Sequence, residues 1–251
     1  MAATVPPLTL CELRDTASFG VESFSPFCVK AHRALRAAGL PYTRRHGMSP
    51  GSFKKLNPTG QVPVLLVGEE PVSDSTRILE RIEALGGVSL NPDPSPAVRA
   101  EAWLWEEFAD TSICGFLFAA RWADDRNWPL VRDAYFAVVP SLVRVVIAGA
   151  MRRRVVGSLV ARDVWRAGPE ECWRRFGALL DQLEARAPKG SGYWVGSAIS
   201  VADISLFAQL HSLRLSLTAW QSSEIAARAS LSAYLDRIDA ETREGGQPKG
   251  A

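Results

Sequence analysis

The pattern of apolar and polar side chains changes its period near the start of the chain. Residues Leu8 to Leu13 alternate between apolar and polar positions, which predicts a β-strand. From Pro26 to Ala38 the apolar side chains are spaced by three, four and three residues, so they share one face of a predicted helix. Gly39 and Pro41 end this helix, because glycine favours the terminating conformation and proline cannot continue it.

Four more elements are predicted before residue 88. Three short apolar or extended runs have the length of strands, and one run with helical spacing follows them. These are strands at Tyr42–His46, residues 62–67 and Pro71–Ser73, and a helix marked by Ile78, Ile82 and Leu85 that ends at Gly86-Gly87. The order strand, helix, strand, strand, strand, helix is typical of a thioredoxin-like α/β unit.

A stiff linker separates this unit from the rest of the chain. Pro92, Pro94 and Pro96 fix the backbone and remove amide donors, and Ser95 is the expected N-cap of a helix that starts at Pro96. Beyond it the apolar spacing is helical almost throughout. We therefore predict three parts: a thioredoxin-like domain at 1–88, a Pro-rich linker at 89–96 and an all-α C-terminal domain at 97–251.

The longest apolar stretch runs from Tyr135 to Ala150. Pro140 and Arg144 interrupt it, and no stretch reaches the roughly 18 consecutive apolar residues that a membrane span needs. This segment is predicted to be a buried helix, and no membrane span is expected.

Composition and charge narrow the functional classes. The formal net charge is +2, so no global field draws nucleic acid or anionic lipid. The run Arg152-Arg153-Arg154 is either a solvated helix face or a site for an anionic partner. The four cysteines of the chain are far apart in the sequence, which favours a reducing compartment. Because Met1–Pro7 also lacks a secretory signal, we predict a cytoplasmic location. The histidines and cysteines show no metal-ligand spacing, so no metal site is expected.

The first candidate for chemistry is Ser25, where a loop passes into the helix at Pro26. A serine N-cap followed by proline directs free backbone amides and the positive end of the helix dipole toward the hydroxyl. An anion, including a thiolate, is stabilised at such a place. Simple capping explains the same residues. Cys28 is the rival nucleophile, although its place on the apolar face favours packing.

Two more segments carry free backbone groups. Val62-Pro63 precedes a strand, and a cis bond there leaves the Val62 amide and carbonyl free to pair with a peptide-like ligand. Asp74-Ser75 opens a helix, where a hydroxyl, a carboxylate and exposed amides could bind an amino-acid-like group. An ordinary strand-entry proline and plain helix capping are the alternatives.

A capping box at Ser200 and Asp203 marks the start of another helix. Its role is structural.

These four segments, taken together and in this order, resemble the cytosolic glutathione S-transferase superfamily over nearly the whole chain. The resemblance implies that Ser25 donates a hydrogen bond to the glutathione thiolate, with Cys28 and, in the long Arg14–Phe24 loop, Ser23 as alternatives. It implies a glutathione site made of Phe27, Lys54, Lys55, Gln61, Val62, Pro63, Asp74 and Ser75. A hydrophobic substrate would lie against Trp103, Trp105, Phe108 and Trp122.

Other segments look like the metaxin and failed-axon-connections branch of that superfamily. They are the stretch 121–136, the arginine-rich segment near Arg153 and residues 25–30. The resemblance implies a glutathione transferase acting on a hydrophobic small molecule as a homodimer, with glutathione as co-substrate. A glutathione-dependent etherase or peroxidase, and a non-catalytic glutathione-binding or protein-interaction module, remain alternatives.

Overall fold

The computed structural model describes residues 5–14, 16, 20–49, 51–85, 89–162 and 164–245, apart from the side chain of Leu142. Gly86 and Gly87, the predicted end of the second helix, lie outside the described residues.

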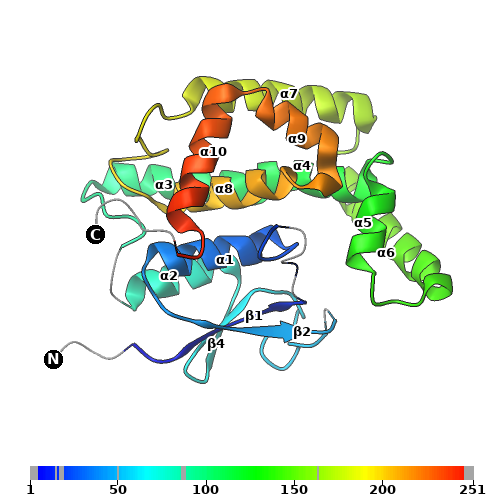
Figure 1. Cartoon of the computed structure of the whole chain (residues 1–251), viewed down its shortest axis with the longest axis horizontal. Helices are drawn as coiled ribbons and strands as arrows, with labels where there is room; N and C mark the ends of the chain where they lie inside the picture. Colours follow the sequence, from blue (N-terminus) through cyan, green and yellow to red (C-terminus); the bar gives the residue numbers. More distant parts are fainter. Residues whose placement is uncertain are drawn as a thin grey trace.

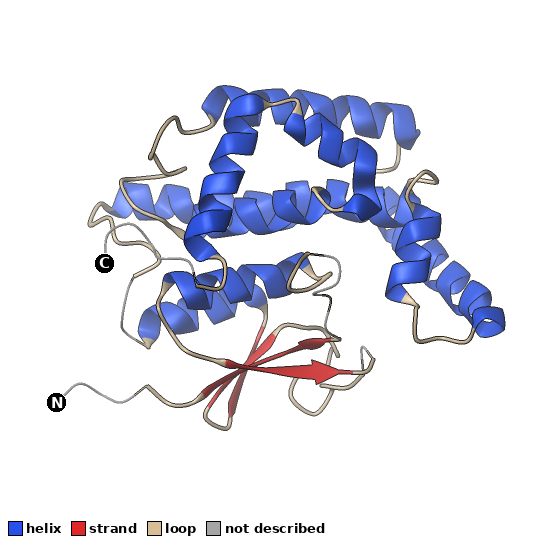
Figure 2. Cartoon of the chain, in the orientation of Figure 1, coloured by secondary structure: helices blue, strands red, loops and turns tan. Residues whose placement is uncertain are grey.

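A four-stranded mixed sheet forms the N-terminal part (Figure 2). Its strand order is β2-β1-β3-β4; β1 is parallel to β2 and antiparallel to β3, which is antiparallel to β4. The strands are β1 Leu8–Leu13, β2 Thr43–Gly47, β3 Val64–Val67 and β4 Glu70–Ser73, and the helices α1 Pro26–Ala37 and α2 Ser75–Ala84 complete the unit. The predicted order of elements is confirmed, with ends displaced by one or two residues.

Both faces of the sheet are covered. Leu8 and Leu10 belong to the main core beneath α1 and α2, whereas Cys11, which points to the opposite face, packs against Phe53 and Val64. In Figure 1, α1 and α2 lie between the sheet and the helical domain. Because α1 packs on the sheet side and on a helix of the other domain, its residues from Cys28 to Leu35 are all buried.

The C-terminal part is helical, and no strand occurs in its described residues. Its first 28 residues form one continuous helical run with two π turns, from Pro96 to Ala123. The elements are α3 Pro96–Phe108, η2 Ala109–Ile113, α4 Cys114–Phe118, η3 Ala119–Ala123, α5 Trp128–Tyr135, α6 Ser141–Ala161, α7 Gly168–Arg186, α8 Val201–Leu213, η4 Ser216–Thr218, α9 Ala219–Ala226 and α10 Ala229–Thr242.

The predicted capping box at α8 is confirmed. The carboxylate of Asp203 accepts from the amide and hydroxyl of Ser200 at 2.9 Å each, and also from the Trp194 amide and the Tyr234 hydroxyl at 2.7 Å. This buried carboxylate therefore connects the start of α8 to α10 and to the loop that precedes α8. Ser95 occupies the N-cap position of α3, but its side chain makes no capping bond.

The prediction of one buried helix from Tyr135 to Ala150 is wrong. Helix α5 ends at Tyr135, and α6 begins only after Pro140, whose fixed φ and missing amide break the helix. Helix α6 extends beyond the body of the molecule (Figure 1) and buries only Ala148 and Leu159 among its described side chains. Among the described residues, no helix has both the length and the apolar character needed to cross a bilayer.

Candidate functional site

Three of the predicted site segments meet at one edge of the sheet. Cys11 of β1 pairs with Val64 of β3, which in turn pairs with Ser73 of β4. This row of paired residues places the end of β1, the start of β3 and the end of β4 side by side, at about 4.8 Å per strand. The segments attached to those ends are the loop to Ser25, Val62-Pro63 and Asp74-Ser75, so strand pairing brings them to the same edge.

Ser25 caps α1 as the sequence predicts. Its backbone is extended, and its Oγ accepts from the Cys28 amide at 3.4 Å. The Ser25 hydroxyl also hydrogen-bonds the Cys28 side chain, but a thiol is a weak acceptor, and the hydroxyl hydrogen can rotate toward a stronger one. The half-buried hydroxyl can therefore donate to an anion at the positive end of the α1 dipole.

The neighbouring Ser23 and Cys28 are both buried. The Ser23 hydroxyl accepts from the Ser25 amide at 3.3 Å, so it shapes the loop that carries Ser25. Burial, reinforced by the negative charge of Glu12, raises the pKa of the Cys28 thiol to about 12. A thiol with that pKa is almost entirely protonated at neutral pH, which makes Cys28 a poor nucleophile.

The Val62–Pro63 bond is cis, which is one of the two alternatives that the sequence left open. Pro63 is buried and Val62 is half-exposed, and neither the amide nor the carbonyl of Val62 joins the turn and loop bonds of the described residues. Asn57 fixes the residue before Val62, because its side-chain amide donates to the Gln61 carbonyl at 3.0 Å. The Val62 backbone is thus held in place with its polar groups available.

Asp74 caps α2 in a strained conformation. Its φ is +81°, a region that non-glycine residues rarely adopt and that costs about 1 to 3 kcal/mol. Its carboxylate accepts from the amides of Thr76 and Arg77 at 3.0 and 3.3 Å. Ser75 beside it is buried, whereas Asp74 is exposed. Such strain is concentrated at ligand sites, which agrees with the candidate position of Asp74.

The remaining predicted glutathione residues differ in exposure. Lys54, Lys55 and Gln61 are exposed, and Phe27 is half-buried on the first turn of α1. The two lysines lie in the loop after β2, among the turns that cover the outer face of the sheet.

A contact that sequence reasoning missed connects this edge to the helical domain. Arg121 of η3 is buried and donates to the carbonyl of Phe24, the residue before Ser25. It also donates to the Tyr135 hydroxyl at 2.9 Å and to the Ser212 carbonyl at 2.6 Å. The rings of Phe24 and Tyr135 stack with centroids 4.8 Å apart. The Ser25 loop is therefore fixed by side chains of the other domain.

The four predicted substrate-contacting aromatics do not come together. Trp122 packs with Trp128, Tyr135 and Phe136, on the side where Tyr135 meets Phe24. Trp105 instead packs on Phe108 and Trp194. Trp105 and Trp122 are 17 residues apart in one helical run, or about 25 Å at 1.5 Å per residue. Trp103 and Phe108 share the distant part of that run, so one small molecule cannot contact all four.

A second missed cluster lies at the domain interface. The ammonium of Lys30 on α1 is fully buried and donates to Glu106 Oε1 at 2.7 Å and to Asp110. Glu106 also accepts from the Thr76 hydroxyl of α2 at 2.7 Å, and Asp110 accepts from Gln209 of α8 at 3.1 Å. Burial raises the pKa of Asp110, although the charge of Lys30 opposes the rise. The cluster fixes the first turn of α2 against the helical domain.

A third network lies beneath the Ser25 loop. The Glu12 carboxylate on β1 is buried and bonds His32 Nε2 at 3.1 Å and Arg44 Nε at 2.7 Å. His32 Nδ1 bonds the Tyr42 hydroxyl at 2.7 Å. Both ring nitrogens of His32 are therefore used within the buried network. Within the described ranges, no three His, Cys, Asp or Glu side chains gather as a potential metal site.

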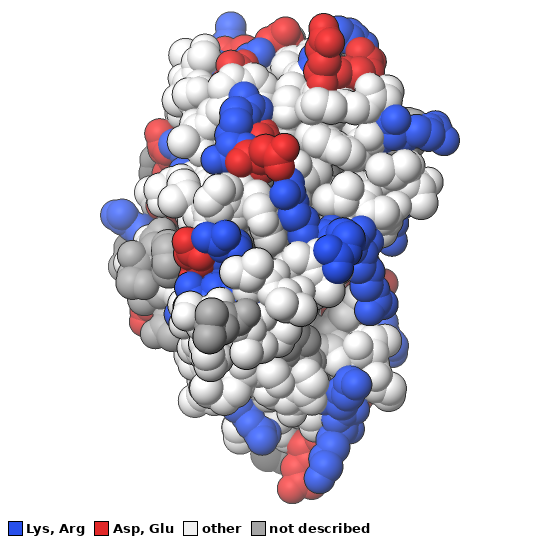
Figure 3. All heavy atoms as spheres, turned by 90° about the vertical axis from the view of Figure 1, so that its right-hand side faces the viewer, with Lys and Arg blue, Asp and Glu red and all other residues white. Residues whose placement is uncertain are grey.

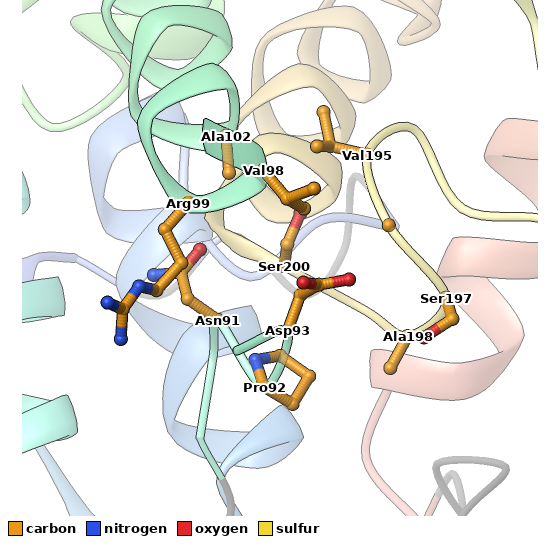
Figure 4. Close-up of a pocket in the computed structure, with 11 residues that line it drawn as sticks. Asn91, Pro92, Asp93, Val98, Arg99, Ala102, Val195, Ser197, Ala198 and Ser200 are labelled. Atoms are coloured by element: carbon orange, nitrogen blue, oxygen red, sulfur yellow. The ribbon is translucent and has the colours of Figure 1, made fainter. Parts of the chain in front are cut away.

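The small hollow at the linker is not part of this edge. Asn91, Asp93, Val98 and Ser200 line it where the linker meets the start of α8 (Figure 4). Its volume of about 10 Å³ holds at most one water molecule. A larger open hollow of about 400 Å³ lies between α5 and η4, and Ala134 and Leu217 contribute to its lining.

Comparison with known proteins covers both parts of the chain. Residues 26–127 match the family model described as the glutathione S-transferase N-terminal domain, and residues 163–237 match the one described as the glutathione S-transferase C-terminal domain. Together the two matches cover well over half of the chain.

Individual relatives give the same picture. The glutathione S-transferase TCHQD of Arabidopsis thaliana is 25% identical over 226 residues, 83% of this chain and 82% of that protein. Protein LigF of Sphingobium sp. strain SYK-6 is 39% identical over 74 residues, which span 28% of each chain. The crystal structure of that protein, a beta-etherase, superposes with a TM-score of 0.58 at 27% identity and covers 93% of this chain and 95% of its own. A glutathione S-transferase of Methylobacterium radiotolerans in complex with glutathione sulfonate has a TM-score of 0.58 at 19% identity, covers 93% of this chain and 91% of its own, and shares the fold.

Proposed function

Because the chain belongs to the glutathione S-transferase superfamily, we propose that it activates the thiol of glutathione at Ser25 for attack on a hydrophobic electrophile. Family membership supports a glutathione-dependent enzyme of the transferase type. The observation that carries the role of Ser25 is its geometry: a capping hydroxyl with a hydrogen to donate, at the N-terminus of α1 and at the sheet edge shared with Val62 and Asp74.

In this proposal each segment holds one part of the tripeptide. Ser25 donates to the sulfur and stabilises the thiolate together with the dipole of α1. The free amide and carbonyl of Val62 pair with the cysteinyl backbone, as in strand addition. The amides of α2, with Asp74 and Ser75, bind the γ-glutamyl end. The carboxylate of the glycine end is assigned to Lys54, Lys55 and Gln61. Their side chains are exposed, so they can reach a carboxylate that faces the solvent.

The electrophile is assigned to the Trp122 side of the helical domain. Trp122, Tyr135 and Phe136 form an aromatic group joined to the Ser25 loop through Phe24. Trp103, Trp105 and Phe108 lie too far along the helical run to share this substrate.

The test compares the enzyme with two variants. Ser25→Ala is expected to lower the rate with a generic electrophile about 100-fold and to raise the pKa of bound glutathione, read from thiolate absorbance against pH. Cys28→Ala, the matched control, is expected to keep that pKa. Loss of activity in the cysteine variant alone would show that Ser25 is not the key residue.

Ether cleavage is the second candidate, favoured by the likeness to a beta-etherase. In that reaction the glutathione thiolate attacks the carbon that carries the ether oxygen; a C–S bond forms, the C–O bond breaks and the oxygen leaves with the electron pair. A model ether with a fluorescent phenol as leaving group distinguishes the two reactions. Release of the phenol with glutathione present, and not without it, would assign the etherase activity.

Calorimetry with glutathione tests the non-catalytic alternative, which the metaxin-like segments at 121–136 support. Binding without a lowered thiol pKa would favour a binding module, and the absence of binding would exclude both enzymes. A homodimer and a cytoplasmic location complete the proposal, and light scattering of the purified chain tests the first of these.

A further inference from the structure

Helices α5 and α6 with their connection form an arm, residues 128–161, that extends from the body of the molecule (Figure 1). The tip of this arm is unusually apolar and exposed. Val138 in the connection is 61% exposed, and Val145 and Val146 of α6 are 62% and 70% exposed. Val143, Ile147 and Met151 are exposed as well. A helix on the surface of a globular protein normally turns polar side chains outward.

The exposed apolar residues of α6 do not all lie in one stripe. Val143, Val146 and Ile147 are spaced by three and one residues and share one face of the helix, whereas Val145, at about 100° per residue, points to nearly the opposite side. A groove on a protein partner covers one face of a helix and would leave Val145 uncovered. A fluid apolar phase can cover both sides.

The charge of the arm is one-sided. Residues 134–162 contain five arginines and neither aspartate nor glutamate. Arg144 and Arg152 are engaged within the molecule, with Asp133 and Asp125, but Arg153 and Arg154 are exposed. They follow Val146 and Ile147 by seven residues, so they extend the same outward face. Figure 3, which looks at this side of the molecule, shows basic side chains more often than acidic ones, between wide uncharged areas.

We propose that the arm docks this protein onto the surface of an anionic lipid membrane, with the apolar tip among the headgroups and Arg153 and Arg154 against the lipid phosphates. The formal net charge of +2 gives no long-range field, so the attraction is local to the arm. A second copy of the chain is a poorer occupant, because residues 134–162 carry no acidic side chain, and a two-fold interface between two arms would offer the arginines no counter-charge.

Vesicle co-sedimentation of the full chain tests the proposal. We expect at least about tenfold stronger binding to vesicles with about 30 mol% phosphatidylserine than to pure phosphatidylcholine, and loss of that binding at high salt. The triple variant Val143→Ser/Val146→Ser/Ile147→Ser and the double variant Arg153→Glu/Arg154→Glu are each expected to weaken binding about tenfold.

Two controls match these variants. Leu104→Ser removes an apolar side chain that is 71% exposed on α3, outside the arm, and Arg99→Glu/Lys189→Glu reverses two exposed charges elsewhere. Both are expected to bind vesicles like the unchanged protein, and circular dichroism verifies that every variant is folded. Equal binding of the arm variants and the unchanged protein, or no binding to anionic vesicles, would overturn the proposal. If the unchanged protein were a dimer that did not bind vesicles, and the triple variant were a monomer, the arm would instead be the contact surface for a second copy.

Discussion

The guanidinium of Arg121, in the helical domain, donates to the backbone carbonyl of Phe24, the residue that precedes Ser25. The proposed thiolate-stabilising hydroxyl is therefore placed by a side chain nearly 100 residues further along the chain. Stacking of Tyr135 on Phe24 reinforces the contact. The position of Ser25 thus depends on how the two parts of the molecule pack.

Replacing this arginine should affect both stability and activity. Arg121→Met leaves the buried acceptors at Phe24 and Ser212 without their charged donor, which should cost about 3 kcal/mol of unfolding free energy in urea titration. With the loop less fixed, glutathione-dependent turnover should fall about tenfold. Arg132→Met, which removes a surface arginine bonded to Asp133, should change neither. If the folded Arg121→Met variant kept the turnover of the unchanged protein, the contact of Arg121 with Phe24 would not be what positions Ser25.

The carboxylate of Glu22 should make stability depend on acid. Burial alone would raise its pKa, but Arg33, Arg36 and its own backbone amide lower the pKa from the usual 4.5 to about 2. The folded state thus binds its proton less readily than the unfolded chain. The stabilisation is complete above pH 4.5 and is lost as the pH falls toward 2.

Glu22→Gln should therefore lower the unfolding free energy at pH 7 by about 3 kcal/mol and flatten its pH dependence below 4.5. Denaturant titrations across that range measure both quantities. Glu80→Gln, which neutralises an exposed carboxylate on α2, should keep the original pH dependence. The same slope in all three proteins would contradict the assignment.

All four cysteines are buried and should be unreactive in the native protein. Burial raises the pKa of Cys28, Cys114 and Cys172 to about 12 and also raises that of Cys11. At pH 8 a thiol of pKa 12 is ionised in only about one molecule in ten thousand. A colorimetric thiol reagent should therefore detect none of them before denaturation and all four after it. Rapid labelling of Cys28 in the native protein would contradict this prediction and would support Cys28 as the nucleophile.

Removing one charge of the buried Lys30 cluster should lower the unfolding free energy far more than removing all three charges together. Lys30→Met leaves Glu106 and Asp110 as buried carboxylates without their cation, which should cost about 3 to 5 kcal/mol. The triple variant Lys30→Met/Glu106→Gln/Asp110→Asn removes all three charges and should recover most of that loss. Thermal or denaturant unfolding of the two variants checks the difference. Equal losses would mean that the charges do not act as one unit.

The sequence by itself determined the local structure of the site. The cap at Ser25, the start of α2 at Asp74 and the capping box at Ser200 depend on neighbours within a few residues, and all are found where the sequence predicted them. The sequence also marked the bond before Pro63 as a candidate cis bond, and it is cis. These features follow from backbone geometry and short-range hydrogen bonds, which a single sequence displays directly.

Only the tertiary structure decided which distant side chains share a place. The apolar spacing of α1 predicted one buried face, but the helix is enclosed on both sides, so Lys30 and His32 are buried and acquire Glu106 and Glu12 as partners. The apolar segment after Tyr135 showed the opposite: its composition predicted burial, yet the break at Pro140 directs α6 away from the core. Hydrophobicity records how favourable burial would be for a segment, whereas the packing of the whole chain determines whether a surface is there to cover it.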